Sequence, residues 1–148
     1  MQKIERILLW ADNTEETKTA AKYAFELSRT YGAKIVAVYV LDTMLIDRLK
    51  RFSSKTAGEI EVELEENAWK YLYYLEELAT HEGIPFSVFI SKGNFVDEIL
   101  KNIDKFKIDL VIIKQSKGKT KRHEQVRDLM SHLTEYSPAS VLLIDQFS

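Results

Sequence analysis

Five short apolar runs recur along this chain, and segments with apolar residues at helical spacing separate them. The runs span residues 6–11, 35–41, 86–90, 109–113 and 141–144. Such runs are typical of strands that are buried on both faces, as in parallel sheets. Strands that alternate with helices predict a parallel sheet covered on both faces. With only 148 residues, we expect one α/β domain over residues 1–148, built on a doubly wound sheet of five parallel strands.

Local signals mark where several helices begin and end. Asn13 followed by Glu16 has the spacing of a capping box, which predicts the start of the first helix. Gly32 is placed to end that helix. Asn94 is expected to cap a helix over residues 95–106.

Three further segments need interpretation. Residues 59–66 alternate glutamate with apolar residues, but apolar positions continue at helical spacing to Leu78, so we interpret them as the start of a helix. Residues 42–58 are interpreted as a loop with helical pieces and a solvated basic cluster. Pro85 directly precedes the third apolar run, which favours a position for that strand at a sheet edge.

Composition excludes several kinds of site and partner. The chain has no cysteine, so disulfides, thiol nucleophiles and cysteine metal sites are ruled out. Its 21 basic and 23 acidic residues give a net charge of −2, which argues against a dedicated DNA-binding domain. No apolar run approaches the roughly 18 residues of a membrane-spanning helix. We therefore expect a cytoplasmic protein without a membrane partner.

The sheet topology indicates where a ligand would bind. Doubly wound sheets bind ligands outside the carboxyl ends of their strands, at the point where the strand order reverses. The residues that directly follow the first and fourth runs are 12–14 and 114–117. Neither a GxGxxG nor a GxxxxGK[ST] motif is present, so ordinary dinucleotide-binding and P-loop sites are not expected. Asp12 is suited to a ribose hydroxyl or a metal ion, and equally to a solvated turn.

The chain resembles the universal stress proteins over nearly its whole length. The matching pieces are a strand followed by Asp12-Asn13-Thr14, a strand that ends in Val40-Leu41-Asp42, Gly93 with a helix before Asp109-Leu110-Val111-Ile112-Ile113, and Pro138 before Val141-Leu142-Leu143-Ile144. The resemblance implies the strand order 3-2-1-4-5. It also implies homodimers that pair through the last strand, which places Val141, Leu142, Leu143 and Ile144 at the interface.

Members of this family that bind ATP carry a glycine motif after the fourth strand, and this chain lacks it. In a register without gaps, the three glycines fall on Lys114, Lys117 and Arg127, and the hydroxyl residue falls on Asp128. Glycines let backbone amides approach a phosphate, whereas long side chains fill that space. The candidate site is therefore degenerate and consists of Ala11, Asp12, Val40, Ile113, Lys114, Lys117, Arg127 and Asp128.

This loss has two interpretations. In the first, the side chains block the phosphate site, and Asp128 caps the last helix with its own carboxylate. In the second, Lys114, Lys117 and Arg127 bind phosphate with side chains in place of backbone amides. The first interpretation predicts at most weak binding of ATP or AMP and no tightly bound cofactor.

The segment 114–122 holds five basic residues and no acid: Lys114, Lys117, Lys119, Lys121 and Arg122. No aromatic residue is interleaved for base stacking, so we expect a solvated loop and no nucleic-acid partner. Neither His123 nor His132 has an obvious nucleophile partner. The resemblance therefore implies a non-catalytic stress-response or regulatory protein that does not bind ATP tightly. The alternatives are a divergent ATP- or AMP-binding module that uses Asp12, Val40 and the basic loop, and a nucleotide hydrolase.

Overall fold

The five apolar runs form one parallel sheet in the computed structural model, which describes residues 3–118 and 120–145. Its strands are β1 (Arg6–Trp10), β2 (Lys34–Asp42), β3 (Phe86–Gly93), β4 (Leu110–Lys114) and β5 (Ser140–Ile144). They lie in the order β3-β2-β1-β4-β5, and each neighbouring pair is parallel. The predicted fold class and strand order are confirmed.

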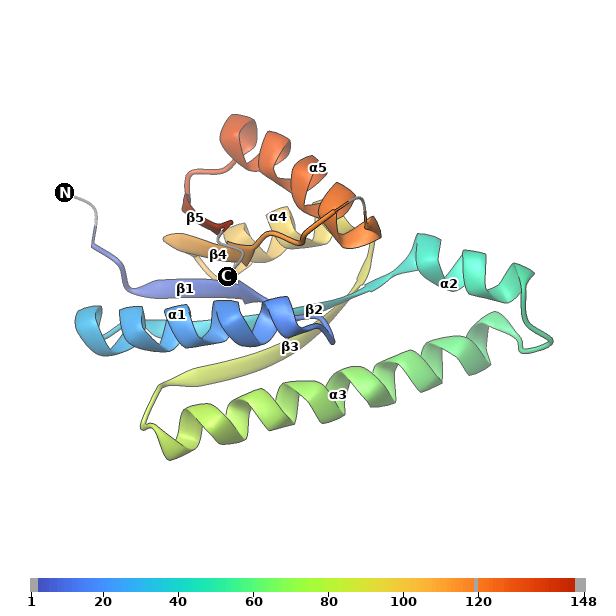
Figure 1. The fold of residues 1–148 in the computed structure, drawn as a ribbon, viewed down its shortest axis with the longest axis horizontal. Helices are drawn as coiled ribbons and strands as arrows, with labels where there is room; N and C mark the ends of the chain where they lie inside the picture. Colours follow the sequence, from blue (N-terminus) through green and yellow to red (C-terminus); the bar gives the residue numbers. More distant parts are fainter. Residues whose placement is uncertain (1–2, 119, 146–148) are drawn as a thin grey trace.

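Helices cover both faces of this sheet (Figure 1). Side chains alternate along β1, so Ile7 and Leu9 pack with α1 (Glu15–Tyr31) and α3 (Ala57–His81). Leu8 and Trp10 point to the opposite face and pack with α4 (Phe95–Lys105) and α5 (Lys121–Tyr136). These four β1 side chains are at most 4% exposed. Each is expected to contribute about 1.5–3 kcal/mol of burial energy.

Side chains cap the starts of α3 and α4, and of these two caps only that of α4 was predicted. Thr56 accepts a hydrogen bond from the Glu59 amide at 3.1 Å and Glu59 reaches back to Thr56, which completes a capping box at the start of α3. Residues 59–66 are therefore helical, as predicted. The side chain of Asn94 accepts a hydrogen bond from the Asp97 amide at 3.1 Å and caps α4.

The predicted capping box of the first helix is wrong. The N-cap of α1 is Thr14, not Asn13, and no side chain caps this helix. The reason is that the Thr14 hydroxyl donates to the carboxylate of Asp12 instead. At the start of α1, the Thr14 side chain therefore bonds to Asp12 and not to the free backbone amides of the helix.

The segments before α3 and α4 are more regular than expected. Residues 43–51 form a complete helix, α2 (Thr43–Arg51), because the Asp42 side chain caps it by accepting from the Met44 amide at 3.0 Å. Strand β3 continues to Gly93, three residues beyond the predicted end, because its pairing with β2 persists to the end of that strand. The φ of Gly93 is 154°, and a Cβ there would lie 2.9 Å from the Glu98 carboxylate.

Candidate nucleotide site at the carboxyl end of the sheet

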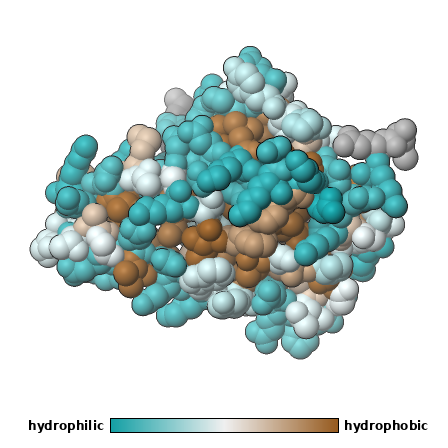
Figure 2. All heavy atoms as spheres, turned by 180° about the vertical axis from the view of Figure 1, so that it is seen from behind, coloured by the Kyte–Doolittle hydropathy of each residue, from teal (hydrophilic) through white to brown (hydrophobic). Residues whose placement is uncertain are grey.

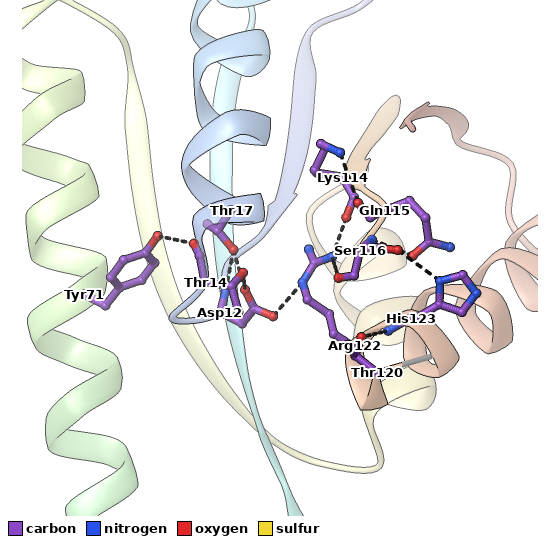
Figure 3. Close-up of polar contacts among 10 residues, drawn as sticks. All are labelled: Asp12, Thr14, Thr17, Tyr71, Lys114, Gln115, Ser116, Thr120, Arg122 and His123. Carbon is purple, nitrogen blue, oxygen red and sulfur yellow. Dashed lines mark hydrogen bonds and ion pairs between the residues drawn. The ribbon is translucent and has the colours of Figure 1, made fainter. Parts of the chain in front are cut away.

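Asp12 stands directly after β1, and all of its carboxylate oxygens are occupied (Figure 3). Its Oδ1 accepts hydrogen bonds from the hydroxyls of Thr14 and Thr17, the latter at 2.6 Å. Its Oδ2 accepts from Nε of Arg122 at 2.9 Å. The Asp12 amide in turn donates to the Thr17 hydroxyl at 3.0 Å. The carboxylate that sequence analysis assigned to a ligand is therefore already bound within the chain.

Arg122 lies in the first turn of α5 and reaches the ends of both central strands. One of its terminal nitrogens donates to the carbonyl of Lys114, at the end of β4, and to the Ser116 hydroxyl at 3.0 Å. The guanidinium lies over the Trp10 ring, 4.6 Å from its centroid. The Arg122 side chain is only 9% exposed. A planar, permanently charged group thus fills the point between β1 and β4 where doubly wound sheets bind ligands.

Two tyrosines lie near Asp12, and one of them, Tyr71, lies on the side away from Arg122 (Figure 3). The Tyr71 hydroxyl donates to the Thr14 carbonyl at 3.4 Å. Burial raises the pKa of Tyr71, and the negative charge of Asp12 raises it further. The pKa of Tyr39 is raised by the same two causes in the same order. Both phenols therefore lose their protons less readily than an ordinary tyrosine does.

Two adjoining cavities open at this end of the sheet. The smaller, about 200 Å³, lies between β1, β2 and α5, and its lining includes Trp10, Asp12, Tyr39, Val40, Lys121 and Gln125. The larger, about 420 Å³, extends from it toward α2 and α4, and its lining includes Asp42, Arg48, Asn94, Glu124 and Asp128. Phe95, Lys121 and Gln125 line both cavities, so the two adjoin each other.

Of the predicted site residues, only three line these cavities: Asp12, Val40 and Asp128. Ala11 and Ile113 are buried in the core. Lys114 is also buried, and its Nζ donates to the Gln115 carbonyl at 3.1 Å. Arg127 is exposed on α5 and lines a separate hollow with Glu124 and Ser131. The structure therefore does not bring Lys114, Lys117 and Arg127 together around the two cavities.

The expected capping role of Asp128 is wrong. Helix α5 begins at Lys121 and is capped by Thr120, whose hydroxyl accepts from the His123 amide at 3.0 Å. Asp128 lies two turns further along and is exposed. The last helix starts earlier than its apolar positions suggest, since its first turn is polar. Neither Arg127 nor Asp128 therefore lies at a helix N-terminus.

Sequence reasoning missed Arg122 as a site residue and treated it only as one member of a basic segment. Of that segment, Lys117 and Lys121 are exposed, whereas Lys114 and Arg122 are buried. Lys119 lies outside the described residues. The one sequence signal for Arg122 was its position, eight residues after the end of the fourth strand, which lies beside the strand that precedes Asp12. Nothing in the letter sequence distinguishes a buried arginine from the solvated ones beside it.

The remaining polar chemistry of the site is modest. His123 contacts the Ser116 carbonyl through Nδ1 at 3.1 Å, and His132 contacts the Asp128 carbonyl at 2.8 Å. Within residues 3–118 and 120–145, no group of three or more histidine or carboxylate side chains is arranged to hold a metal ion.

Comparison with known proteins decides the family. The sequence matches the universal stress protein family over residues 3–144. The chain belongs to that family. No curated protein sequence matches this universal stress protein significantly. Within the part of the chain that the structure describes, no helix has the length and apolar character needed to cross a membrane.

Solved structures share the fold of this universal stress protein at low sequence identity. The hypothetical protein MJ0577 has a TM-score of 0.79 and 19% identity, with 99% of each chain covered. A universal stress protein in complex with cAMP has a TM-score of 0.68 and 13% identity, covering 97% of this chain and 98% of that one. An Arabidopsis thaliana family member with AMP bound has a TM-score of 0.66 and 14% identity, covering 97% and 93%.

Proposed function

We propose that this universal stress protein is a non-catalytic regulatory protein whose nucleotide site is closed by its own Arg122. The observation that supports this proposal is the ion pair between Arg122 and Asp12, with the guanidinium buried against Trp10. A nucleotide whose ribose used Asp12 would have to displace Arg122 from that carboxylate. The displaced guanidinium would also lose the Lys114 carbonyl and the Ser116 hydroxyl.

The energetic consequence is large relative to ordinary ligand affinity. Leaving one member of a buried ion pair without its partner costs about 3–5 kcal/mol. Because each 1.4 kcal/mol is a factor of about ten in a dissociation constant, this cost would weaken ATP binding by two or more orders of magnitude. We therefore expect a dissociation constant for ATP above roughly 100 μM, or weaker than about −5.5 kcal/mol.

The phosphate end of the site supports the same proposal. The segment that follows β4, residues 114–128, has Gly118 as its one glycine, so no glycine-rich backbone is available there to approach a phosphate.

The second candidate function is a divergent adenine-nucleotide-binding module. Two structural neighbours hold cAMP and AMP, respectively. The adjoining cavities near Asp12 and Val40 favour this alternative, because they leave space for a small ligand. In this case Arg122 would turn from Asp12 to the ligand's phosphate, which its planar guanidinium can bind in a bidentate manner.

Calorimetry with ATP, AMP and cAMP separates these proposals. The variant Arg122→Gln removes the charge that occupies Asp12, and Arg127→Gln is the matched control because Arg127 is exposed outside both cavities. A closed site predicts weak binding by the wild type, at least fivefold tighter ATP binding by Arg122→Gln, and no change in Arg127→Gln. Tight binding by the wild type that Arg122→Gln abolishes would establish the divergent module instead.

We also propose that two copies pair through β5. This strand is one edge of the sheet, with Val141, Leu142 and Leu143 half-buried and Ile144 buried. Its outer backbone groups have no strand neighbour among the described residues. Antiparallel pairing with the same strand of a second copy would satisfy these groups and give a closed two-fold dimer.

A further inference from the structure

The opposite edge of the sheet, β3, has features that neither the nucleotide site nor the proposed β5 dimer uses. Strand β3 is eight residues long, whereas the other edge strand, β5, has five. Its only strand neighbour among the described residues is β2. Its position at an edge agrees with the prediction from Pro85. Phe86, Val88, Phe89 and Ile90 are all half-buried. Long, apolar, unpaired edges are sites where another strand adds to a sheet.

The backbone groups that face outward from β3 can be assigned. The Pro85 carbonyl accepts from the Ile35 amide of β2 at 2.9 Å, so Pro85 faces inward. Residues along a strand alternate in the direction of their backbone groups. The amides and carbonyls of Phe86, Val88, Ile90 and Lys92 therefore point away from β2, and those of Ser87, Phe89 and Ser91 point toward it.

Aromatic side chains flank this edge on both faces of the sheet. On one face, Trp69 and Tyr73 of α3 stack with their ring centroids 5.4 Å apart, and Tyr73 is 56% exposed. On the other face, Phe89 packs on Phe106 at 4.5 Å. Figure 2 shows hydrophobic surface gathered across the middle of the side opposite to the view of Figure 1, bordered by hydrophilic surface.

Helix geometry places Trp69 and Tyr73 beside the edge. Tyr74, Leu75 and Leu78 line a hollow between α3 and α1, so they mark the side of α3 that faces the sheet centre. At about 100° per residue, Trp69 and Tyr73 lie on the opposite flank, toward the outside of β3. Lys92 of β3 pairs with Glu61 of α3 at 2.8 Å, which agrees with this arrangement.

Charge on this flank indicates the kind of strand that fits. Glu65 and Glu76 lie on the same flank as Trp69 by the same helical geometry. A second copy added in an antiparallel manner would bring two acidic α3 flanks together, which like-charge repulsion opposes. A strand with basic side chains would instead pair with them.

We propose that the β3 edge is a docking site for an extended segment of another protein, one that alternates apolar with polar residues and carries basic side chains. Its backbone would pair with the outward groups of Phe86, Val88, Ile90 and Lys92. Its apolar side chains would pack beside the Trp69–Tyr73 stack, and its basic side chains would face Glu65 and Glu76. This is strand addition, in which the backbone supplies affinity and alternate side chains supply selectivity.

Hydrogen exchange with a synthetic peptide tests the proposal. The probe is Lys-Val-Thr-Val-Thr-Val-Lys, and its matched control carries N-methyl groups on alternate amides, which removes donors without changing side chains. In the free protein, the amides of Phe86, Val88 and Ile90 should exchange at least tenfold faster than those of Ser87 and Phe89, which face β2. The probe at up to about 1 mM, the weak end of specific affinities, should slow the outward set selectively, and the control should not.

Variants sharpen the result. Val88→Pro removes an outward amide that β2 does not use and should weaken probe binding about tenfold, whereas Val88→Thr keeps the amide and should not. The double variant Glu65→Gln with Glu76→Gln should weaken probe binding about threefold at low salt. No slowing by the probe would overturn the proposal, even if Val88→Pro fails to fold. Slow outward amides in the free protein, with protection that rises with protein concentration, would also overturn it by placing a second copy on β3.

Discussion

At the scale of single residues, Arg122 has the most consequences, because its partners come from two segments far apart in the chain, residues 10–12 and 114–116. Arg122→Ala should lower the free energy of unfolding by about 3 kcal/mol, since Asp12 keeps its charge but loses its partner. Arg127→Ala, on the exposed side of the same helix, should change it by less than about 0.5 kcal/mol. Urea denaturation of both variants measures this difference. Equal losses of unfolding free energy in the two variants would show that the ion pair contributes no net stability. In that case, adding Asp12→Asn to Arg122→Ala should restore no stability.

Tyr71 gives a prediction about alkaline pH. Its pKa is raised in the folded protein, so the folded state holds this proton more tightly than the unfolded chain does. The associated stability is fully present below the ordinary tyrosine pKa of about 10 and is lost as the pH rises above it. The urea midpoint should therefore fall above about pH 10, and less steeply in Tyr71→Phe. Tyr73→Phe is the control because Tyr73 is 56% exposed. An identical fall in both variants would contradict the prediction.

The candidate site could be predicted from sequence only in part, and single residues show why. Asp12 was identified because it follows the first strand, and strand order fixes where strand ends lie. Val40 was identified only through the resemblance to the universal stress proteins. Arg122 could not be identified, because its burial depends on the stacking surface of Trp10 and on acceptors 8 and 110 positions away. Arg127 and Asp128 were misplaced because a register without gaps ignores where the last helix starts.

At the scale of elements, the cap of α3 gives a direct test of local sequence signals. Thr56→Ala removes the side chain that accepts from the Glu59 amide, and should cost about 1 kcal/mol. Thr14→Ala is the informative comparison, because Thr14 occupies the N-cap of α1 without capping it. The stability lost in Thr14→Ala should instead come from the lost hydrogen bond to Asp12, so it should largely disappear in an Asp12→Ala background. The stability lost in Thr56→Ala should persist in that background. Thermal denaturation of the wild type, the three single variants and the two double variants measures both effects.

The elements themselves were largely predictable, since buried strands and long amphipathic helices leave strong periodic signals. The failures lie at short polar segments. Helix α2 was predicted only as helical pieces within a loop, because its nine residues give too few turns for a clear period. The end of β3 was placed too early because Lys92 and Gly93 have no apolar signal, although pairing with β2 carries the strand through them. Pairing between strands is a tertiary property that local sequence does not contain.

At the scale of the whole molecule, the proposed β5 dimer makes the last prediction. Val141→Lys with Leu143→Lys places two charges in the outer strand and should convert a dimer into monomer or insoluble protein, because paired strands would hold four lysines together. Val141→Thr with Leu143→Met is the matched control and should remain dimeric. Light scattering measures the mass, and circular dichroism checks the fold. If the lysine variant remained a dimer, β5 would be ruled out as the interface. If the wild type were a monomer, the proposed dimer itself would be ruled out.

The central position of the first strand also sets the timing of folding during synthesis. Strand β1 pairs with β2 on one side, Ile7 lying opposite Ile35, and with β4 on the other, Ile7 lying opposite Leu110. At about 5–20 residues per second, translation from the first partner to the second takes roughly 4–15 s. Throughout that interval the emerging chain carries a strand with one open edge and four consecutive apolar residues, Ile7 to Trp10. A ribosome-associated chaperone that recognises extended apolar segments could bind it during this time.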